Sequence, residues 1–220
     1  MTKKILNSFQ VKVLQLFKTS ILAKKFYLSG GTALAQFYLQ HRFSEDLDFF
    51  TQEELDLDEL KKFINLIQKE TQIIDIKFQR GFGLYTFFLK DKKQVYKIDF
   101  GQYPFGPIEK LKNFSGLLVE SMYDIAVNKT HTIAFRPRLR DFIDLYFILQ
   151  KESEWTFQEL LNRSFEKFEM KVDQLQLGEN LLQVRKLADM PKMIKKVDLL
   201  KVQACYIEEL KKLKAKIWKK

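Results

Sequence analysis

Apolar residues recur along the chain with two different spacings, and each spacing predicts a different kind of element. Residues three or four positions apart share one face of a helix, whereas alternate residues share one face of a strand. The helical spacing predicts helices over residues 4–23, 32–40, 58–69, 121–134, 138–149, 157–168 and 201–219. Extended runs predict strands over residues 26–28, 47–50, 72–79, 84–89 and 94–100, the last two joined by a turn at 90–93.

The two kinds of element occupy different parts of the chain. Every predicted strand precedes a loop at residues 101–107, which holds two glycines and two prolines. After this loop the pattern is helical, with a short helix or loop starting at Pro191. We therefore predict an α+β fold, with a mixed β-sheet flanked by helices over residues 1–110 and a helical region over residues 111–220.

Composition indicates a folded protein with a large core. Of the 220 residues, 46% are hydrophobic and 21 are Phe, which argues against disorder. No stretch approaches about 18 uninterrupted apolar residues, so we expect no membrane association. The N-terminal residues do not form a secretory signal. A single cysteine, Cys205, excludes an internal disulfide and fits a reducing compartment, so we expect a cytoplasmic location.

Positive charge is concentrated near the C-terminus. The formal net charge is +10, and residues 181–220 contain 12 Lys and Arg against 4 Asp and Glu, a surplus of 12 − 4 = +8. A cationic surface favours a polyanionic partner, and nucleic acid is the commonest. A lysine-rich helix that faces water and aids solubility explains the same composition.

Residues 28–50 combine two features suited to phosphate chemistry. Gly30 and Gly31 lie where a strand turns into a helix, and such helix N-termini present unpaired N–H groups to anions. Asp46 and Asp48 are two positions apart, so on a strand they point to one face. At about 4 Å they would repel by about 4 kcal/mol at an effective dielectric near 20, unless one is protonated or a cation lies between them. At a frayed strand end, water would screen this repulsion instead.

The residues around these positions are similar to a known family signature. It consists of GGTALA at residues 30–35 and HRFSEDLDF at residues 41–49. Together they resemble the AbiEii/AbiGii-type nucleotidyltransferase toxins, a branch of the DNA-polymerase-β-like nucleotidyltransferase superfamily. The superfamily pattern is a Gly-Gly or Gly-Ser turn, a short helix, and then Asp-x-Asp or Asp-x-Glu. The resemblance covers most of residues 20–150.

This resemblance implies a third carboxylate and a metal site. In the superfamily, an acid on a neighbouring strand completes the cluster, and Asp99 in the Ile98-Asp99-Phe100 run matches it. Asp46, Asp48 and Asp99 would then hold two Mg²⁺ ions that orient the triphosphate and offset the charge on departing pyrophosphate. The helical region would complete the active-site groove. Alone, Asp99 is also explained as an ordinary strand-end acid.

A second cluster of charged residues lies at positions 121–146. It also resembles the toxin family, in which a lysine on one helix precedes an Arg/Lys-Asp-x-x-Asp-Leu segment on the next. Lys129 starts from a largely apolar helix face and needs an anionic partner, either Asp141 or a ligand phosphate. We expect Lys129 to contact the triphosphate while Asp141 holds it in place. Asp144 shares the helix face of Asp141, where helix packing or capping explains it equally well.

The remaining candidates would contact the nucleotide. Gly30, Gly31 and Thr32 form the turn, Ser44 faces the same site as Asp46, and Arg140 grips phosphates or lines a solvated turn; Asp144 completes this set. For Ser44, a cap on a neighbouring turn is an equal explanation.

The family implies transfer of a nucleoside monophosphate from an NTP to an acceptor, with RNA such as tRNA as acceptor. The protein would be the toxin of a bacterial toxin–antitoxin or phage-defence pair, with a cognate antitoxin protein. Two alternatives stay open. One is transfer of a phosphoryl or nucleotidyl group to a protein, including the enzyme itself at Ser44. The other is a non-catalytic module that binds nucleic acid.

Overall fold

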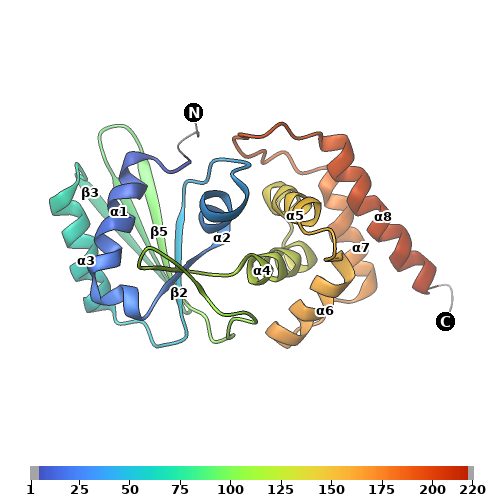
Figure 1. Ribbon diagram of the computed structural model, residues 1–220, viewed down its shortest axis with the longest axis horizontal. Coiled ribbons are helices and arrows are strands. Elements are labelled where there is room, and N and C mark those ends of the chain that lie inside the picture. Colours follow the sequence, from blue (N-terminus) through green and yellow to red (C-terminus); the bar gives the residue numbers. More distant parts are fainter. Residues whose placement is uncertain (1–4, 218–220) are drawn as a thin grey trace. The chain divides into compact units, whose positions relative to one another are not determined.

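The chain forms two compact units, Met1–Ser121 and Met122–Lys220. The structure is a computed structural model that describes residues 5–217, with side chains from 5 to 213 (Figure 1). Among the described residues, the strands all lie in the first unit and the second unit is helical, so the predicted α+β class is confirmed. The first unit ends at Ser121 rather than at residue 110, because two further strands follow the predicted loop.

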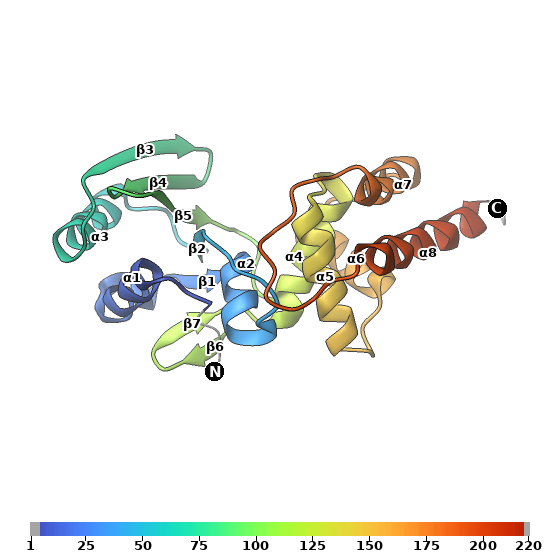
Figure 2. The same ribbon diagram turned by 90° about the horizontal axis from the view of Figure 1, so that it is seen from above.

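The first unit is a seven-stranded mixed sheet with helices. Its helical segments are α1 (Ser8–Thr19), η1 (Ile21–Lys24), α2 (Gly30–Ala33), η2 (Leu34–Leu39) and α3 (Leu57–Glu70). Its strands are β1 (Tyr27–Ser29), β2 (Leu47–Thr51), β3 (Asp75–Gly81), β4 (Leu84–Lys90), β5 (Val95–Gln102), β6 (Lys112–Phe114) and β7 (Leu117–Val119). The strand order is β3-β4-β5-β2-β1-β7-β6, and Figure 2 shows β3, β4, β5 and β2 following one another. The central pair β2 and β5 is parallel, whereas β1 and β2 are antiparallel.

One face of this sheet forms the core of the first unit. Phe49 on β2 and Phe100 on β5 are paired in register and stack with ring centroids 5.4 Å apart. Phe17 of α1 stacks on Phe49 at 4.2 Å, and Phe63 of α3 meets Phe17 edge-on at 5.7 Å. Each fully buried ring contributes about 1.5–3 kcal/mol, so these contacts fix α1 and α3 against this face. The alternate residues of β2 and β5 must therefore point to the opposite face.

Local side-chain chemistry sets the helix starts. The Asn7 side chain caps α1 by accepting from the Gln10 backbone N–H at 2.8 Å, and the Gln10 side-chain oxygen accepts from the Asn7 backbone N–H at 3.0 Å. This capping box starts the helix at Ser8. A helix was predicted over residues 4–23, and α1 is shorter, because the chain leaves the α-helix at Ser20 and continues as a 3₁₀ turn. Residue 4 lies outside the described residues. Asp56 caps α3 by accepting from two backbone N–H groups.

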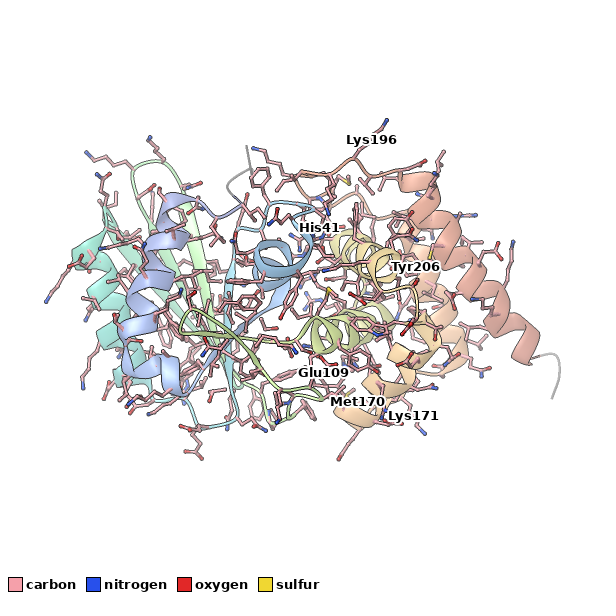
Figure 3. The ribbon with its side chains drawn as sticks, viewed as in Figure 1. His41, Glu109, Met170, Lys171, Lys196 and Tyr206 are labelled. Carbon is pink, nitrogen blue, oxygen red and sulfur yellow. The ribbon has the colours of Figure 1, made fainter. Side chains whose placement is uncertain are left out.

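The second unit is a bundle of helices. They are α4 (Met122–Phe135), α5 (Leu139–Lys151), α6 (Phe157–Phe168), α7 (Gln174–Leu182), the 3₁₀ turn η3 (Gln183–Arg185) and α8 (Leu199–Ile217). Tyr206 of α8 is fully buried here, and its hydroxyl donates to the Phe142 carbonyl of α5 at 2.8 Å (Figure 3). The last helix was predicted over 201–219; residues 218 and 219 lie outside the described residues. No helix in the described part is long and apolar enough to cross a membrane.

A buried ion pair joins α4 to α6. The Lys167 ammonium lies 2.9 Å from Asp124 and also donates to the Asn128 side chain at 3.0 Å. The side chains of Lys167 and Asp124 are 3% and 0% exposed, so each charge depends on the other for solvation. The sequence did not single out either residue.

Candidate active site

The three predicted carboxylates lie on one face of the sheet in the first unit. Asp48 of β2 and Asp99 of β5 are direct partners in the parallel register, so their side chains share a face. Asp46 precedes Asp48 by two residues and points the same way. Their neighbours Leu47, Phe49, Ile98 and Phe100 point into the core on the other face.

The diglycine turn packs directly on this face. Gly30 has φ +70°, in the left-handed region, and a Cβ there would come within 3.0 Å of Asp48 Oδ2. Glycine is therefore required at position 30 both by the backbone conformation and by the approach of the carboxylate. The sequence places the turn beside the acids, and the structure brings Gly30 and Asp48 into contact distance.

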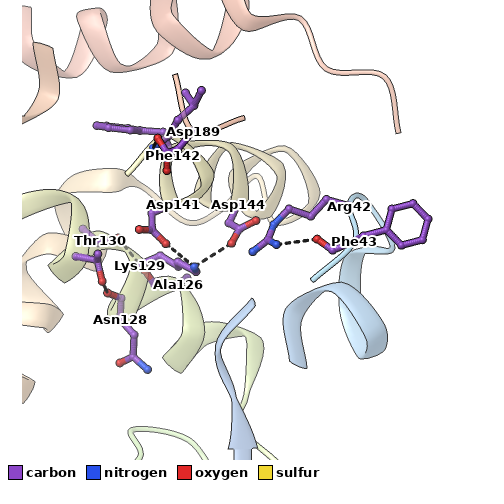
Figure 4. Close-up of polar contacts among 12 residues, drawn as sticks. Arg42, Phe43, Ala126, Asn128, Lys129, Thr130, Asp141, Phe142, Asp144 and Asp189 are labelled. Atoms are coloured by element: carbon purple, nitrogen blue, oxygen red, sulfur yellow. Dashed lines mark hydrogen bonds and ion pairs between the residues drawn. The ribbon is translucent and has the colours of Figure 1, made fainter. Parts of the chain in front are cut away.

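Gly31 is covered by two polar side chains that follow the short helix. A Cβ on Gly31 would come within 3.0 Å of Arg42 Nη2 and would lie 3.0 Å from Ser44 Oγ. Arg42 is 4% exposed and donates to the Phe43 carbonyl at 2.9 Å (Figure 4). Thr32 is fully buried, and its hydroxyl donates to the Asp46 carbonyl. Thr32 thus ties the turn to the start of β2 through its side chain.

A lysine that the sequence analysis overlooked lies among the carboxylates. Lys97 of β5 precedes Asp99 by two residues, donates to Asp99 Oδ2, and lies 3.9 Å from Asp46 Oδ2. Burial lowers the pKa of Lys97, but the hydrogen bond to Asp99 and the charges of Asp99, Asp46 and Asp48 outweigh it, so its pKa is raised. The other oxygen of Asp99 accepts from the Thr86 hydroxyl of β4 at 2.6 Å.

The donor set fits a divalent cation of the Mg²⁺ type. Among the described residues no three His, Cys, Asp or Glu side chains are already arranged as a ligand cage. The three carboxylates nevertheless share one face, and the ammonium of Lys97 shows that the space between Asp46 and Asp99 attracts a cation. Carboxylate oxygens are the ligands that Mg²⁺ prefers. Asp46, Asp48 and Asp99 would hold it.

A buried carboxylate supports the turn from the side away from β2. Glu120 follows β7, is 1% exposed, and accepts from the hydroxyl of Ser29, the residue before Gly30. Tyr38 donates to the Glu120 carbonyl at 2.8 Å. Burial, followed by the charge of Glu120, raises the pKa of Tyr38 to about 12. Because Ser29 pairs with Asp48, this network continues the polar row of the sheet.

The second predicted cluster forms within the second unit. Lys129 of α4 donates to Asp141 and lies 2.9 Å from Asp144, both on α5 (Figure 4). The side chains of Lys129, Asp141 and Asp144 are 12%, 5% and 0% exposed. Lys129 thus pairs with the predicted partner Asp141 and also with Asp144. Arg140 lies half-buried in the first turn of the same helix.

Two solved structures share the fold of this chain. JHP933 from Helicobacter pylori superposes with a TM-score of 0.60 at 19% identity, over 96% of this chain and 93% of that chain. A second H. pylori protein, provisionally assigned as a nucleotidyltransferase, gives a TM-score of 0.59 at 20% identity over 96% and 98% of the two chains.

The particular family follows from the sequence. Residues 12–206 match the family described as Nucleotidyl transferase AbiEii toxin, Type IV TA system, and the chain belongs to this family. An uncharacterized protein of Aquifex aeolicus (strain VF5) is 36% identical over 148 residues, which are 63% of this chain and 64% of that protein. The match therefore spans less than two thirds of this relative. This match confirms the family that residues 30–49 resemble.

Proposed function

We propose that this protein is a Mg²⁺-dependent nucleotidyltransferase that moves a nucleoside monophosphate from an NTP to RNA. One observation carries the proposal: three carboxylates, from β2, from β5 and from the residue just before β2, lie on the sheet face on which the diglycine turn packs. Carboxylates beside a glycine turn are the equipment for binding a metal-bound triphosphate.

The reaction follows from the parts at this face. A hydroxyl oxygen of the acceptor forms a bond to the α-phosphorus, the bond from that phosphorus to the bridging oxygen breaks, and pyrophosphate leaves. The hydroxyl proton passes to a carboxylate of the cluster. Bound Mg²⁺ supplies charge neutralisation for the triphosphate and for the leaving pyrophosphate. Glycine at positions 30 and 31 lets the Asp48 carboxylate and the Arg42 guanidinium approach the backbone of the turn, and Arg42 adds a positive charge at Gly31.

Lys129 is the proposed phosphate contact of the helical unit. Asp141 and Asp144 hold its ammonium from the same helix, so the side chain is oriented before a ligand arrives. Such preorganisation lowers the entropic cost of binding. Arg140, which precedes Asp141 on α5, would add a second cation to that of Lys129 on α4.

The basic C-terminal segment is the proposed RNA surface. Within α8, Lys211 and Lys212 pair with Glu208 and Glu209 one turn earlier, and each lysine is about two-thirds exposed. Exposed pairs of this kind are weak, so the lysines can exchange their partners for phosphates. RNA affinity should fall steeply with salt, and an affinity unchanged between low and moderate salt would rule out this surface.

The family supports a proposal for the biological role. As a member of a toxin family, the protein is proposed to be the toxin of a toxin–antitoxin or phage-defence pair with a cognate antitoxin protein, and tRNA is the proposed acceptor. Both proposed substrates, and the single Cys205, fit a reducing cytoplasm.

Labelled nucleotides test the reaction. The purified protein is incubated with bulk tRNA, Mg²⁺ and each NTP in turn, labelled either at the α- or at the γ-phosphate. We expect RNA to retain the α-label and not the γ-label, and EDTA or Asp48→Asn to abolish the transfer. Lys93→Met, at the exposed β4–β5 turn, is the matched control and should transfer normally.

The other outcomes each point to a different function. Label on the protein, lost in Ser44→Ala, would replace RNA transfer with self-modification. RNA binding that persists in Asp48→Asn, with no label transferred by the wild-type protein to any acceptor, would leave a non-catalytic binding module.

A further inference from the structure

Lys97 is a positive charge built into the proposed metal site. Its ammonium donates to Asp99 Oδ2 and lies 3.9 Å from Asp46 Oδ2, so it links two of the three carboxylates. The second oxygen of Asp99 is held by Thr86 at 2.6 Å. The oxygen of Asp99 that faces Asp46 is therefore the one that Lys97 occupies.

The charges explain why a cation must be there. Asp48 of β2 and Asp99 of β5 bring two negative charges to adjacent strand positions, Asp46 adds a third just before β2, and the Asp99 side chain is only 9% exposed. Like charges at neighbouring positions repel strongly where water is partly excluded. Lys97 lowers the total from −3 to −2 and links two of the acids directly.

A divalent cation and this ammonium compete for the same oxygens. A metal ion that binds Asp46 and Asp99 must take the position that Lys97 now holds, and two like charges do not share it. The Lys97 ammonium can move away from the two carboxylates, because the side chain is 34% exposed and carries its charge on a flexible four-carbon stem. After withdrawal, the ammonium stays on the same sheet face and can contact a triphosphate.

We propose that Lys97 is a displaceable counter-ion of the carboxylate cluster, which holds the acids together without metal and makes divalent-ion binding depend on nucleotide. This inference rests on the proposed function of the same site. A metal ion that binds alone must displace the Lys97 ammonium, and no new contact replaces those that the ammonium loses. Metal that arrives with a triphosphate brings negative charge, and this charge gives the expelled ammonium a new partner.

Calorimetric titration with Mn²⁺ measures this coupling. For the wild-type protein we expect weak binding of Mn²⁺ alone and at least about tenfold tighter binding with a non-hydrolysable α,β-methylene NTP. Lys97→Met keeps the aliphatic stem without the charge, so Mn²⁺ alone should bind about tenfold tighter and the effect of nucleotide should shrink. Lys97→Arg keeps the charge and should resemble the wild type. Lys93→Met changes the net charge equally at an exposed turn and should have no effect.

Stability without metal provides a second readout. In EDTA, Lys97→Met removes the positive charge that links Asp46 to Asp99 and should unfold at a lower temperature than the wild type, whereas saturating Mn²⁺ should restore the unfolding temperature. Should this variant fail to fold, the wild-type protein answers the question through amine labelling followed by mass spectrometry. Mn²⁺ with the nucleotide analogue should change the labelling rate of Lys97 and leave that of Lys93 unchanged.

The inference and the proposed function fail in different ways. If the wild type binds Mn²⁺, Asp48→Asn abolishes this binding, and Lys97→Met binds no tighter than the wild type, then Lys97 is not a competitor. An unchanged labelling rate at Lys97 would contradict displacement in the same way. If neither the wild type nor Lys97→Met binds Mn²⁺ with nucleotide present, the proposed function itself is overturned.

Discussion

Gly30 offers a direct test of how the turn positions a carboxylate. Gly30→Ala adds a methyl group at φ +70°, where the left-handed conformation costs an L-residue about 1–2 kcal/mol. The same methyl group would come within 3.0 Å of Asp48 Oδ2, and overpacking of this kind costs about 1–3 kcal/mol more. We expect a total loss of about 2–5 kcal/mol in the free energy of unfolding.

The structure supplies a matched control for the conformational part. Gly116, in the β6–β7 turn, has φ +87°, and a Cβ there would meet no atom within 4 Å. Gly116→Ala carries the strain and the same loss of unfolded-chain entropy, but no clash. Urea unfolding should therefore show Gly30→Ala to be less stable than Gly116→Ala by about 1–3 kcal/mol.

A double-mutant cycle with Asp48 assigns this difference to the carboxylate. In an Asp48→Ala background the methyl group has no Oδ2 to meet, so Gly30→Ala should cost about as much as Gly116→Ala. Transfer activity should be lost in Gly30→Ala and retained in Gly116→Ala, because the clash turns Asp48 away from the cluster. Equal costs of Gly30→Ala with and without Asp48 would refute the packing argument.

Three further expectations concern the helical unit. Lys167→Met leaves Asp124 charged and buried, and should lower the free energy of unfolding by about 3–5 kcal/mol, whereas adding Asp124→Leu should recover part of it; equal losses would contradict the pairing. Burial lowers the pKa of His131 to about 4, and its Nδ1 has no hydrogen-bond partner. The unfolded chain therefore binds the extra proton, stability should fall by about 1 kcal/mol as the pH drops from about 6.5 to 4, and His131→Phe should remove that part of the pH dependence in urea titrations. Asp144→Asn leaves Lys129 with one charged partner and should cost about 1–3 kcal/mol and reduce label transfer, and unchanged values of both would exclude a role in orienting the lysine.

The site residues that sequence could predict are those set by short-range rules. Alternation along a strand places Asp46 and Asp48 on one face, and helical spacing places Asp141 and Asp144 on another. The same alternation applies to Lys97, which precedes Asp99 by two residues. The position of Lys97 on the same strand face as Asp99 could therefore be predicted from the sequence, although a lysine is not itself a metal ligand.

Other features depend on contacts between distant segments. Glu120 supports Ser29 because β7 lies beside β1, and three-residue strands such as β7 carry too little alternation to be recognised. The helix over Gln174–Leu182 was not predicted, since Gly178 weakens its helical pattern. A Cβ at Gly178 would lie 3.2 Å from Leu210 Cδ1, so glycine there lets α7 and α8 pack closely.

Ser29, Asp48, Asp99 and Thr86 occupy a single cross-strand row on β1, β2, β5 and β4. Their alignment is encoded in the pairing of backbones rather than in the loops that join the strands. The connections can therefore lengthen or shorten among relatives while the reactive groups stay in line. A one-residue deletion inside β2 or β5 would turn Asp48 or Asp99, respectively, toward the apolar interior, so natural variation in length should be confined to the segments between strands.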